Sequence, residues 1–515
     1  MQSQITEALA RLPAYLGGHA SVSVTALLLG LAISLPLALA STRRPVLRGL
    51  LLGAASIVQT IPSLALLALF YPLLLALAAL CERLFGASFS ALGFLPSVIA
   101  LTLYSMLPVL RNTVTGLMGV APAIKEAALG VGMTRRQSLF MVELPLALPV
   151  IMAGIRTAAV WVIGTATLST PIGQTSLGNY IFSGLQTQNW VFVLFGCVAA
   201  AVFALLVDQL LALIDGGLVR RSRARVMAGG LGLVLVTAGA LLPGLSQPRA
   251  TYVVGTKSFT EQYILAALIN QQLGEAGMSA AVRAGLGSSV IFNALRSGEI
   301  DAYVDYSGTI WANQMHRNDV APRETVLAEA AKWLADEHGI VMLGELGFEN
   351  AYALAMPRKR ADELSIRSIA DLVWHARRFS IAGDFEFFAR PEWASIRKAY
   401  GIEFRNRRQM QSTFMYSAVA EGEVDVISAY TSDGRITQYD LAVLEDPKHA
   451  IPPYDAILLI SPQRANDKAL RDALQPLIGA INVKLMRAAN LRASQGGTGA
   501  SPADTARWLW QQVRR

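Results

Sequence analysis

Glu126-Ala-Ala-Leu-Gly-Val-Gly132 and the Val142-Glu-Leu-Pro145 that follows it form a stretch between two long apolar segments of this 515-residue chain. The small alanine side chains let another surface approach closely. Gly132 permits a sharp turn, and Pro145 suits the first turn of the next helix, where its missing N–H costs nothing. The stretch is therefore predicted to be either a docking site for another protein or an amphipathic helix that touches only lipid.

The composition of the chain changes near residue 250. Overall, 53% of the residues are hydrophobic. Before residue 250, apolar runs recur that reach about 20 residues, the length that spans a bilayer. After it, charged residues and short alternating segments dominate. We expect a membrane domain over 1–225, a last span with a linker over 226–250, and a soluble domain over 251–515.

The distribution of positive charge predicts the membrane topology. Candidate spans are 20–40, 50–80, 95–115, 145–168, 190–214 and 226–246. Pro62 interrupts the second, which is either one broken helix or two spans. If residues 50–80 count as one span, eleven cations lie in loops on one side of the membrane and only Arg83 lies in the loops on the other, which is a positive-inside pattern. If they count as two spans, the cations are divided between both sides and the pattern is lost. The eleven are Arg43, Arg44, Arg48, Arg111, Lys125, Arg135, Arg136, Arg220, Arg221, Arg223 and Arg225.

This topology places the N-terminus and the soluble domain outside the membrane and residues 119–144 inside. It also accounts for the net charge of +8, so we predict membrane lipid and no nucleic acid as a partner. Residues 220–244 resemble an internal secretory leader. We expect them to be a retained anchor, because cleavage would detach the soluble domain, although the sequence leaves cleavage open.

The soluble part alternates strands with helices, a pattern typical of βαβ units and a largely parallel sheet. Two such series predict two lobes, one formed by about 251–352 and 457–515 and the other by about 353–456. Strands near 352–356 and 457–460 are expected to cross between them. The predicted strands are 252–256, 282–286, 302–304, 378–382 and 424–429, and the predicted helices are 259–273, 288–296, 392–400 and 412–421.

Several classes of chemistry find no support in the sequence. Gly255-Thr-Lys-Ser lacks the spacing of a phosphate-binding loop, so the chain is not expected to be its own ATPase. The five histidines are scattered, and no paired-carboxylate or Ser-His-Asp arrangement stands out. We predict no catalytic residue, no metal, no cofactor and no enzymatic activity.

The first stretch resembles the cytoplasmic loop by which importer permeases of the ABC (ATP-binding cassette) class dock onto their ATPase. That pattern reads E-A-A, three residues, G, nine residues, I, one residue, L-P. This chain supplies it with Glu126, Ala127, Ala128, Gly132, Val142 in place of Ile, Leu144 and Pro145. The resemblance implies an α-helical type I permease of about six spans, a separate cytoplasmic ABC ATPase and a homodimer of this chain.

The soluble half is similar to the substrate-binding proteins for glycine betaine, choline and carnitine. Their fold is a two-lobed α/β domain like the type II periplasmic binding proteins. Some members of this family, including ergothioneine importers, fuse permease and binding domain in this order. The motifs are Gly255-Thr-Lys-Ser-Phe-Thr-Glu-Gln262, Gly298-Glu-Ile-Asp-Ala-Tyr-Val-Asp-Tyr-Ser-Gly-Thr309, Asn350-Ala-Tyr352, Phe385-Glu-Phe-Phe-Ala-Arg390, Ala429-Tyr-Thr-Ser-Asp-Gly-Arg435 and Pro452-Pro-Tyr454.

The resemblance implies an aromatic cage, because a quaternary ammonium has no N–H and is attracted to aromatic faces. A single tyrosine is more often a core residue; four in matching motifs favour the cage.

Arg390 is expected to bind a ligand carboxylate through a bidentate fork or to pair within its lobe with Asp384 or Glu386. Asp in place of Thr309 would favour choline, so Thr309 implies a broader or different ligand. The implied ligand residues are Gln262, Tyr306, Thr309, Asn350, Tyr352, Arg390, Tyr430 and Tyr454.

The function implied by both halves is ATP-driven import of quaternary-ammonium osmoprotectants through the bacterial inner membrane. Ergothioneine or another betaine-like amino acid is the alternative cargo. A membrane receptor that binds solute without transporting it is a second alternative, and a membrane-tethered enzyme is a third. The docking loop argues against the receptor, and the lack of a catalytic constellation argues against the enzyme.

Overall fold

The computed structural model describes residues 2–86, 89–186, 189–245, 250–317, 319, 321–384, 386–494 and 500–515. Two compact units divide near residue 249, and each is described by itself. In the first unit, six helices are long and apolar enough to cross a membrane. Their bounds are α1 Gln2–Ser41, α3 Ser63–Phe85, α4 Phe94–Met118, α7 Leu144–Ala166, α9 Trp190–Val219 and α10 Arg223–Leu245.

The segment 50–80 forms two helices, α2 (Pro45–Thr60) and α3. The break falls at Ile61, whose backbone is extended, the conformation favoured before a proline. Tyr104 on α4 donates its hydroxyl to the Ile61 carbonyl. With 16 residues, α2 is shorter than the other apolar helices. The open question of one helix or two is therefore resolved as two helices.

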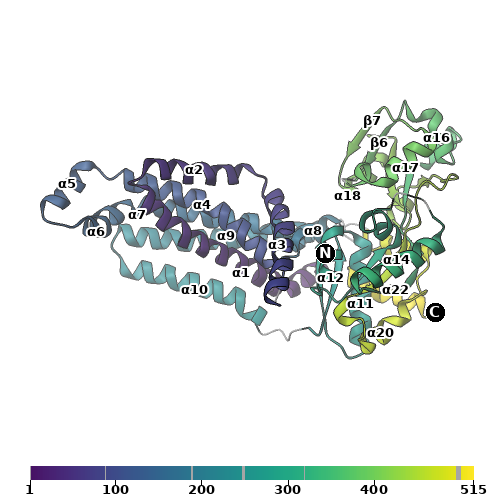
Figure 1. Cartoon of the computed structure of the whole chain (residues 1–515), viewed down its shortest axis with the longest axis horizontal. Helices are drawn as coiled ribbons and strands as arrows, with labels where there is room; N and C mark the ends of the chain where they lie inside the picture. The colour runs from purple at the N-terminus through teal and green to yellow at the C-terminus, as the bar shows by residue number, and fades with distance from the viewer. Residues whose placement is uncertain are drawn as a thin grey trace. The chain divides into compact units, whose positions relative to one another are not determined.

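The short helices gather at the two ends of the bundle (Figure 1). Helices α5 (Pro122–Gly130) and α6 (Arg135–Ser138) lie beyond one end, and α8 (Gly178–Gln186) lies at the other. The turn between α9 and α10, with its four arginines, lies at the same end as α5 and α6. The start of α2 belongs there as well, because Arg48 Nη1 lies 2.8 Å from Met118 Sδ at the end of α4.

Helix α4 is the centre of the membrane unit and packs against α1 and α7. At Gly30 of α1, a Cβ atom would collide with the Ser105 side chain. At Gly154 of α7, a Cβ atom would lie 2.7 Å from the Pro108 carbonyl oxygen. Small residues at such crossings let membrane helices approach closely.

The second unit contains two five-stranded sheets. The first has the order β2-β1-β3-β10-β4 and the second β7-β6-β8-β5-β9. In each sheet the first three strands in this order are parallel, and the neighbour of the third is antiparallel to it. The strands are β1 Tyr252–Lys257, β2 Ala280–Leu286, β3 Ala302–Tyr306, β4 Val341–Glu349, β5 Tyr352–Pro357, β6 Ser380–Gly383, β7 Asn406–Gln409, β8 Val426–Tyr430, β9 Leu441–Val443 and β10 Asp455–Ile460.

The two sheets define two lobes, which confirms the predicted fold class. The chain leaves the first sheet after β4 and returns to it at β10. The two crossing segments lie side by side, because the Asn350 N–H donates to the Tyr454 carbonyl at 2.9 Å. The main helices are α11 Thr260–Glu275, α12 Ser288–Arg296, α14 Arg323–His338, α16 Ile369–Ala376, α17 Pro391–Tyr400, α18 Ser412–Ala420, α20 Lys468–Leu474, α21 Val483–Ser494 and α22 Pro502–Val513.

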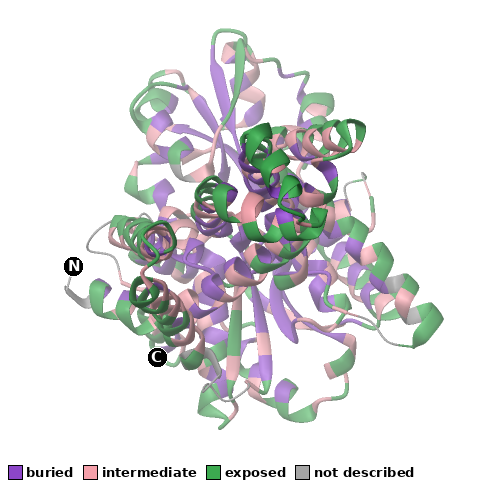
Figure 2. Ribbon diagram, turned by 90° about the vertical axis from the view of Figure 1, so that its left-hand side faces the viewer, coloured by how far each residue is buried: buried purple, intermediate pink, exposed green. Residues whose placement is uncertain are grey.

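The two units differ in the side chains that they expose, as expected for a membrane domain and a soluble domain. In Figure 2 the central strands of the two sheets are largely buried and the outer faces of helices are exposed. On the membrane helices, those outer faces carry large apolar side chains such as Leu205 and Leu231, 60% and 61% exposed. In the two-lobed unit, few large apolar side chains are exposed in the described ranges, and Trp374 is the most exposed at 87%.

Candidate functional site

A cavity of about 240 Å³ lies between the two lobes. Both lobes contribute to it, through the ends of β3 and β8 and through the segments that cross between the sheets. Seven of the eight predicted ligand residues line this cavity. They are Tyr306, Thr309, Asn350, Tyr352, Arg390, Tyr430 and Tyr454.

Tyr430 and Tyr454 form an aromatic wall with Tyr352 at its centre. The centroid of its ring lies 5.0 Å from that of Tyr430 and 6.0 Å from that of Tyr454, with the Tyr454 ring nearly perpendicular. Tyr306 stacks instead on Phe259 at 6.2 Å. Phe387 packs beside Tyr352 at 5.3 Å. Ring faces and edges of this kind attract a cation that has no hydrogen-bond donor.

Three of the four tyrosine hydroxyls donate to carboxylates. Tyr306 donates to Glu261 at 2.5 Å and Tyr430 donates to Asp384 at 2.5 Å. Tyr454 donates to Glu392. No sequence pattern assigned Glu261 or Glu392 to the site, although Glu261 lies inside one of the binding-domain motifs. A carboxyl group in the first turn of a helix was the only signal.

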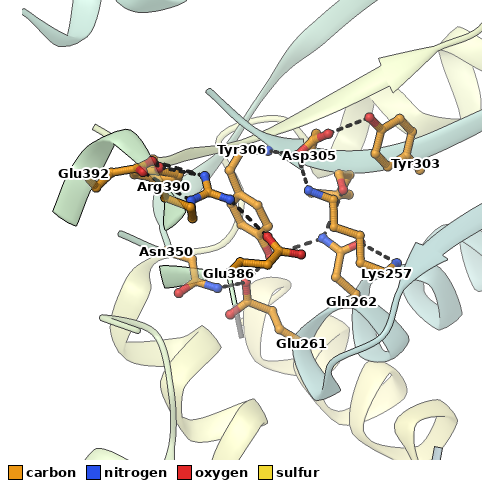
Figure 3. Close-up of polar contacts among 12 residues, drawn as sticks. Lys257, Glu261, Gln262, Tyr303, Asp305, Tyr306, Asn350, Glu386, Arg390 and Glu392 are labelled. Carbon is orange, nitrogen blue, oxygen red and sulfur yellow. Dashed lines mark hydrogen bonds and ion pairs between the residues drawn. The ribbon is translucent and has the colours of Figure 1, made fainter. Parts of the chain in front are cut away.

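Glu261 sits at the buried N-terminus of α11 and accepts several hydrogen bonds from neutral donors. Asn350 Nδ2 lies 3.1 Å away, Ser432 Oγ 2.5 Å and Asn490 Nδ2 2.8 Å. Burial raises the pKa of the Glu261 carboxyl group above its usual range, although the hydrogen bonds from Ser432, Tyr306 and Asn490 oppose that shift. Figure 3 shows Glu261 and Asn350 close together below Tyr306.

Gln262 does not line the cavity. Its amide nitrogen donates to the Val304 carbonyl at 3.0 Å and to the Tyr306 hydroxyl at 3.2 Å. Gln262 is fully buried because it lies on the side of α11 that faces the sheet. Gln262 therefore supports Tyr306 from behind, and its direct contact with a ligand stays a prediction.

Arg390 is held within its own lobe (Figure 3). Its Nε and Nη2 donate to the two carboxylate oxygens of Glu392 at 3.2 and 3.1 Å, and its Nη1 donates to Glu386 at 3.2 Å. Nη2 also donates to the Tyr454 hydroxyl at 3.1 Å. Of the two lobe partners considered, Glu386 is bound and Asp384 is not. The guanidinium lies 5.1 Å from the Tyr352 ring centroid, so it stiffens the aromatic wall.

A buried ion pair lies beneath the cavity. Lys257 Nζ is 2.5 Å from Asp305 Oδ1, and Asp305 also accepts from the Tyr303 hydroxyl and the Tyr306 N–H. Lys257 itself lines the cavity. Sequence reasoning missed this pair, because the two residues lie on different strands and nothing in either motif links them.

The predicted docking loop protrudes from the end of the membrane unit. Glu126 and Ala127 on α5 are exposed, whereas Ala128 is buried. Gly132 has φ of +87°, which fits the turn expected there. Lys125 holds the loop to the bundle by donating to the Leu117 carbonyl at 2.9 Å and pairing with Glu143 at 3.6 Å.

The helix around Pro145 begins earlier than expected. It runs from Arg135 through a π-helical turn, Leu139–Glu143, into α7. The π turn contains Val142 and directly precedes Leu144 and Pro145. A proline cannot donate to the carbonyl one turn before it, and the change from π to α pairing at this point accommodates that loss. Phe140 and Met141 are 62% and 65% exposed, so the loop presents apolar surface.

Two protein-family models match the chain in tandem. A binding-protein-dependent transport system inner membrane component matches residues 30–220. A substrate-binding domain of an ABC-type glycine betaine transport system matches residues 250–512. Both families are transport components, so the chain is a membrane transport subunit and not an enzyme, and its permease family works with an ABC ATPase.

Known relatives agree with this order of domains. The ergothioneine transport permease/ergothioneine binding protein of Helicobacter pylori (strain G27) is 30% identical over an alignment 464 residues long, and the alignment covers 86% of this chain and 80% of that protein. A glycine betaine/carnitine/choline transport system permease protein of Bacillus subtilis (strain 168) is 41% identical, covering 39% of this chain and 84% of the relative. A glycine-betaine-binding protein of Pseudomonas aeruginosa is 32% identical, covering 50% and 87%. The chain therefore belongs to the ABC importers of betaine-type solutes, in the group that fuses the permease to its substrate-binding domain.

Proposed function

We propose that this chain captures quaternary-ammonium solutes outside the bacterial inner membrane and passes them inward. The observation that carries the proposal is the position of Tyr306, Tyr352, Tyr430 and Tyr454, which come from both lobes and line one cavity. A trimethylammonium group enclosed by these rings would be desolvated and attracted to their faces. The ligand would then favour the closed arrangement of the lobes by its differential affinity.

A separate cytoplasmic ATPase supplies the energy in this proposal. The loop around Glu126 supports it, because exposed apolar side chains, Val131 among them at 76%, stand there beside Arg135 and Arg136. Such a mixed surface fits a protein partner better than lipid alone. Importers of this type use two membrane domains, so we propose a homodimer with two binding domains, with lipid covering the outer helix faces.

Glycine betaine, choline or carnitine is the proposed cargo. Ergothioneine, itself a betaine, is a second candidate. The Helicobacter pylori relative is named as an ergothioneine permease and binding protein, and it aligns with 86% of this chain. Among the described side chains of the cavity, the fork of Arg390 is occupied by Glu392. A ligand carboxylate would therefore have to displace that pair or use neutral donors such as Thr309 and Asn350.

Titration calorimetry on the full-length chain in detergent tests the proposal. The panel is glycine betaine, choline, carnitine, proline betaine and ergothioneine. We expect saturable binding of at least one of them, and the strongest binder identifies the cargo. Failure of all five to bind to a folded protein would reject the proposed function.

A further inference from the structure

Two tyrosine hydroxyls of the cavity donate hydrogen bonds to the buried carboxylates of Glu261 and Asp384. Resting on the proposed function, we infer that Glu261 and Asp384 determine the specificity of the site for a positively charged ligand. Each accepts the hydroxyl of a cage tyrosine at 2.5 Å. Both are at least nine-tenths buried, with exposed fractions of 3% and 8%.

Neither carboxylate has a cationic partner among the residues that the structure describes. Within the described part of the chain, Glu261 accepts from Tyr306, Ser432 and two asparagines. Asp384 accepts from Tyr430 and from the backbone N–H groups of Glu386 and Phe387. Their negative charge therefore remains available to a ligand.

The cations that line the cavity are each bound to other acids. Lys257 pairs with Asp305, Arg435 pairs with Asp433, and Arg390 pairs with Glu386 and Glu392. Glu392 accepts from Tyr454 but has Arg390 as a cationic partner, so it is not assigned the same role. Among the described residues, the buried acids of the cavity without a cationic partner are Glu261 on one lobe and Asp384 on the other.

A phenol that donates to a carboxylate gains electron density in its ring. Charge-assisted bonds of this kind are stronger than neutral ones, and neighbouring hydrogen bonds polarise each other in a low dielectric. The faces of Tyr306 and Tyr430 then attract a cation more strongly. The carboxylates add a direct Coulomb attraction, which is weakly screened in a buried site. Because Glu261 and Asp384 belong to different lobes, the attraction is complete only with both lobes around the ligand.

The test compares each ammonium ligand with an isostere of the same shape that lacks the positive charge of the trimethylated group. Choline and glycine betaine are titrated against their tert-butyl isosteres, in which carbon replaces the quaternary nitrogen. The proteins are the full-length chain, Glu261→Gln and Asp384→Asn, at about pH 8, above the ordinary carboxyl range. Asp384→Asn retains an oxygen for the two backbone donors. Asp467→Asn is the matched control, because Asp467 accepts from Tyr252 at 2.9 Å outside the cavity.

We expect each cavity variant to lower the preference for the ammonium ligand over its isostere by about 5-fold or more, whereas Asp467→Asn leaves the ratio unchanged. Equal losses for both ligand types, with the ratio kept in both cavity variants, would overturn the inference and leave the carboxylates a purely structural role. The unsubstituted chain serves a separate purpose: if it binds no ammonium ligand, the proposed function fails instead. Thermal unfolding of each variant confirms that the protein measured is folded.

Discussion

At the residue scale, Tyr352 is the central residue of the aromatic wall. Its ring contacts those of Tyr430, Tyr454 and Phe387, and Arg390 lies over it. Family motifs lead directly to such aromatic positions. The acids that hold the neighbouring hydroxyls have no comparable signal, because Glu261, Asp384 and Glu392 meet their tyrosines only through tertiary structure.

Tyr352→Ala is expected to weaken binding of a quaternary ammonium by about 1–2 kcal/mol, the scale of a desolvated cation–π contact. Tyr352→Phe retains the ring and is the control, with a loss well below that of the alanine variant. Calorimetry on the full-length chain measures both. Equal affinities of Tyr352→Ala and the unsubstituted chain would remove Tyr352 from the cage.

The pH dependence of binding follows from Glu261. Burial raises its pKa in the folded chain, so the group becomes protonated as the pH falls through that raised value, and its charge is lost to the ligand. Affinity for a cation should therefore be full at high pH and decline on acidification, and Glu261→Gln should flatten this profile. Charged and titratable neighbours are Tyr306, bonded to it, and Asp433, which is itself paired with Arg435.

The same shift gives the sign of a stability effect. Because the folded-state pKa lies above that of the unfolded chain, protonation of Glu261 stabilises the fold, and its contribution is lost as the pH rises through the folded-state value. Relative to Glu261→Gln, the unsubstituted chain should thus gain unfolding free energy on mild acidification. The opposite slope in chemical denaturation would contradict the assigned direction.

At the element scale, the regular strands and helices of the two lobes follow from sequence patterns. Predicted strands near 252, 282, 302, 378 and 424 occur as β1, β2, β3, β6 and β8, and the predicted helices 259–273 and 288–296 occur as α11 and α12. Strands β4 and β7 were not predicted. Gly344 and Gly347 have positive φ within β4, and all four residues of the edge strand β7 are polar and exposed, so neither shows an apolar alternation.

The docking loop yields a prediction at this scale. Glu126→Lys is expected to abolish capture of an ABC ATPase by the purified chain, because it reverses an exposed charge on α5. Ligand binding by the two-lobed domain should stay unchanged, which separates docking from misfolding. Lys332→Glu on α14, an exposed charge reversal outside the loop, is the control. Retained ATPase capture by Glu126→Lys would favour the membrane receptor.

Helices α7 and α9 are tied by an ion pair within the membrane unit. Arg156 donates through Nε and Nη2 to both oxygens of Asp208, at 2.9 Å each. Removing one partner leaves an unpaired charge in the membrane, so Arg156→Met should cost about 3 kcal/mol or more. The double variant Arg156→Met with Asp208→Asn should recover most of that loss. Thermal unfolding in nanodiscs checks this, and an additive double variant would show that the pair is not coupled.

At the scale of the whole molecule, one polypeptide combines a permease with a two-lobed binding domain. Hydropathy and charge revealed this division, because membrane spans and soluble lobes differ in composition along the whole chain. The break between α2 and α3 shows the limit of that reasoning. Hydropathy marks an apolar stretch, but the conformation at Ile61 and Pro62 decides whether it is one helix or two.

The central claim is that this chain both binds the solute and conducts it, with ATP hydrolysed by a partner. The direct measurement is uptake of a labelled trimethylammonium solute by proteoliposomes that contain the chain and its ATPase. We predict accumulation that requires ATP on the side of the ATPase and that is lost in Tyr352→Ala and, independently, in Glu126→Lys. Binding of the solute without any ATP-dependent accumulation would contradict the account.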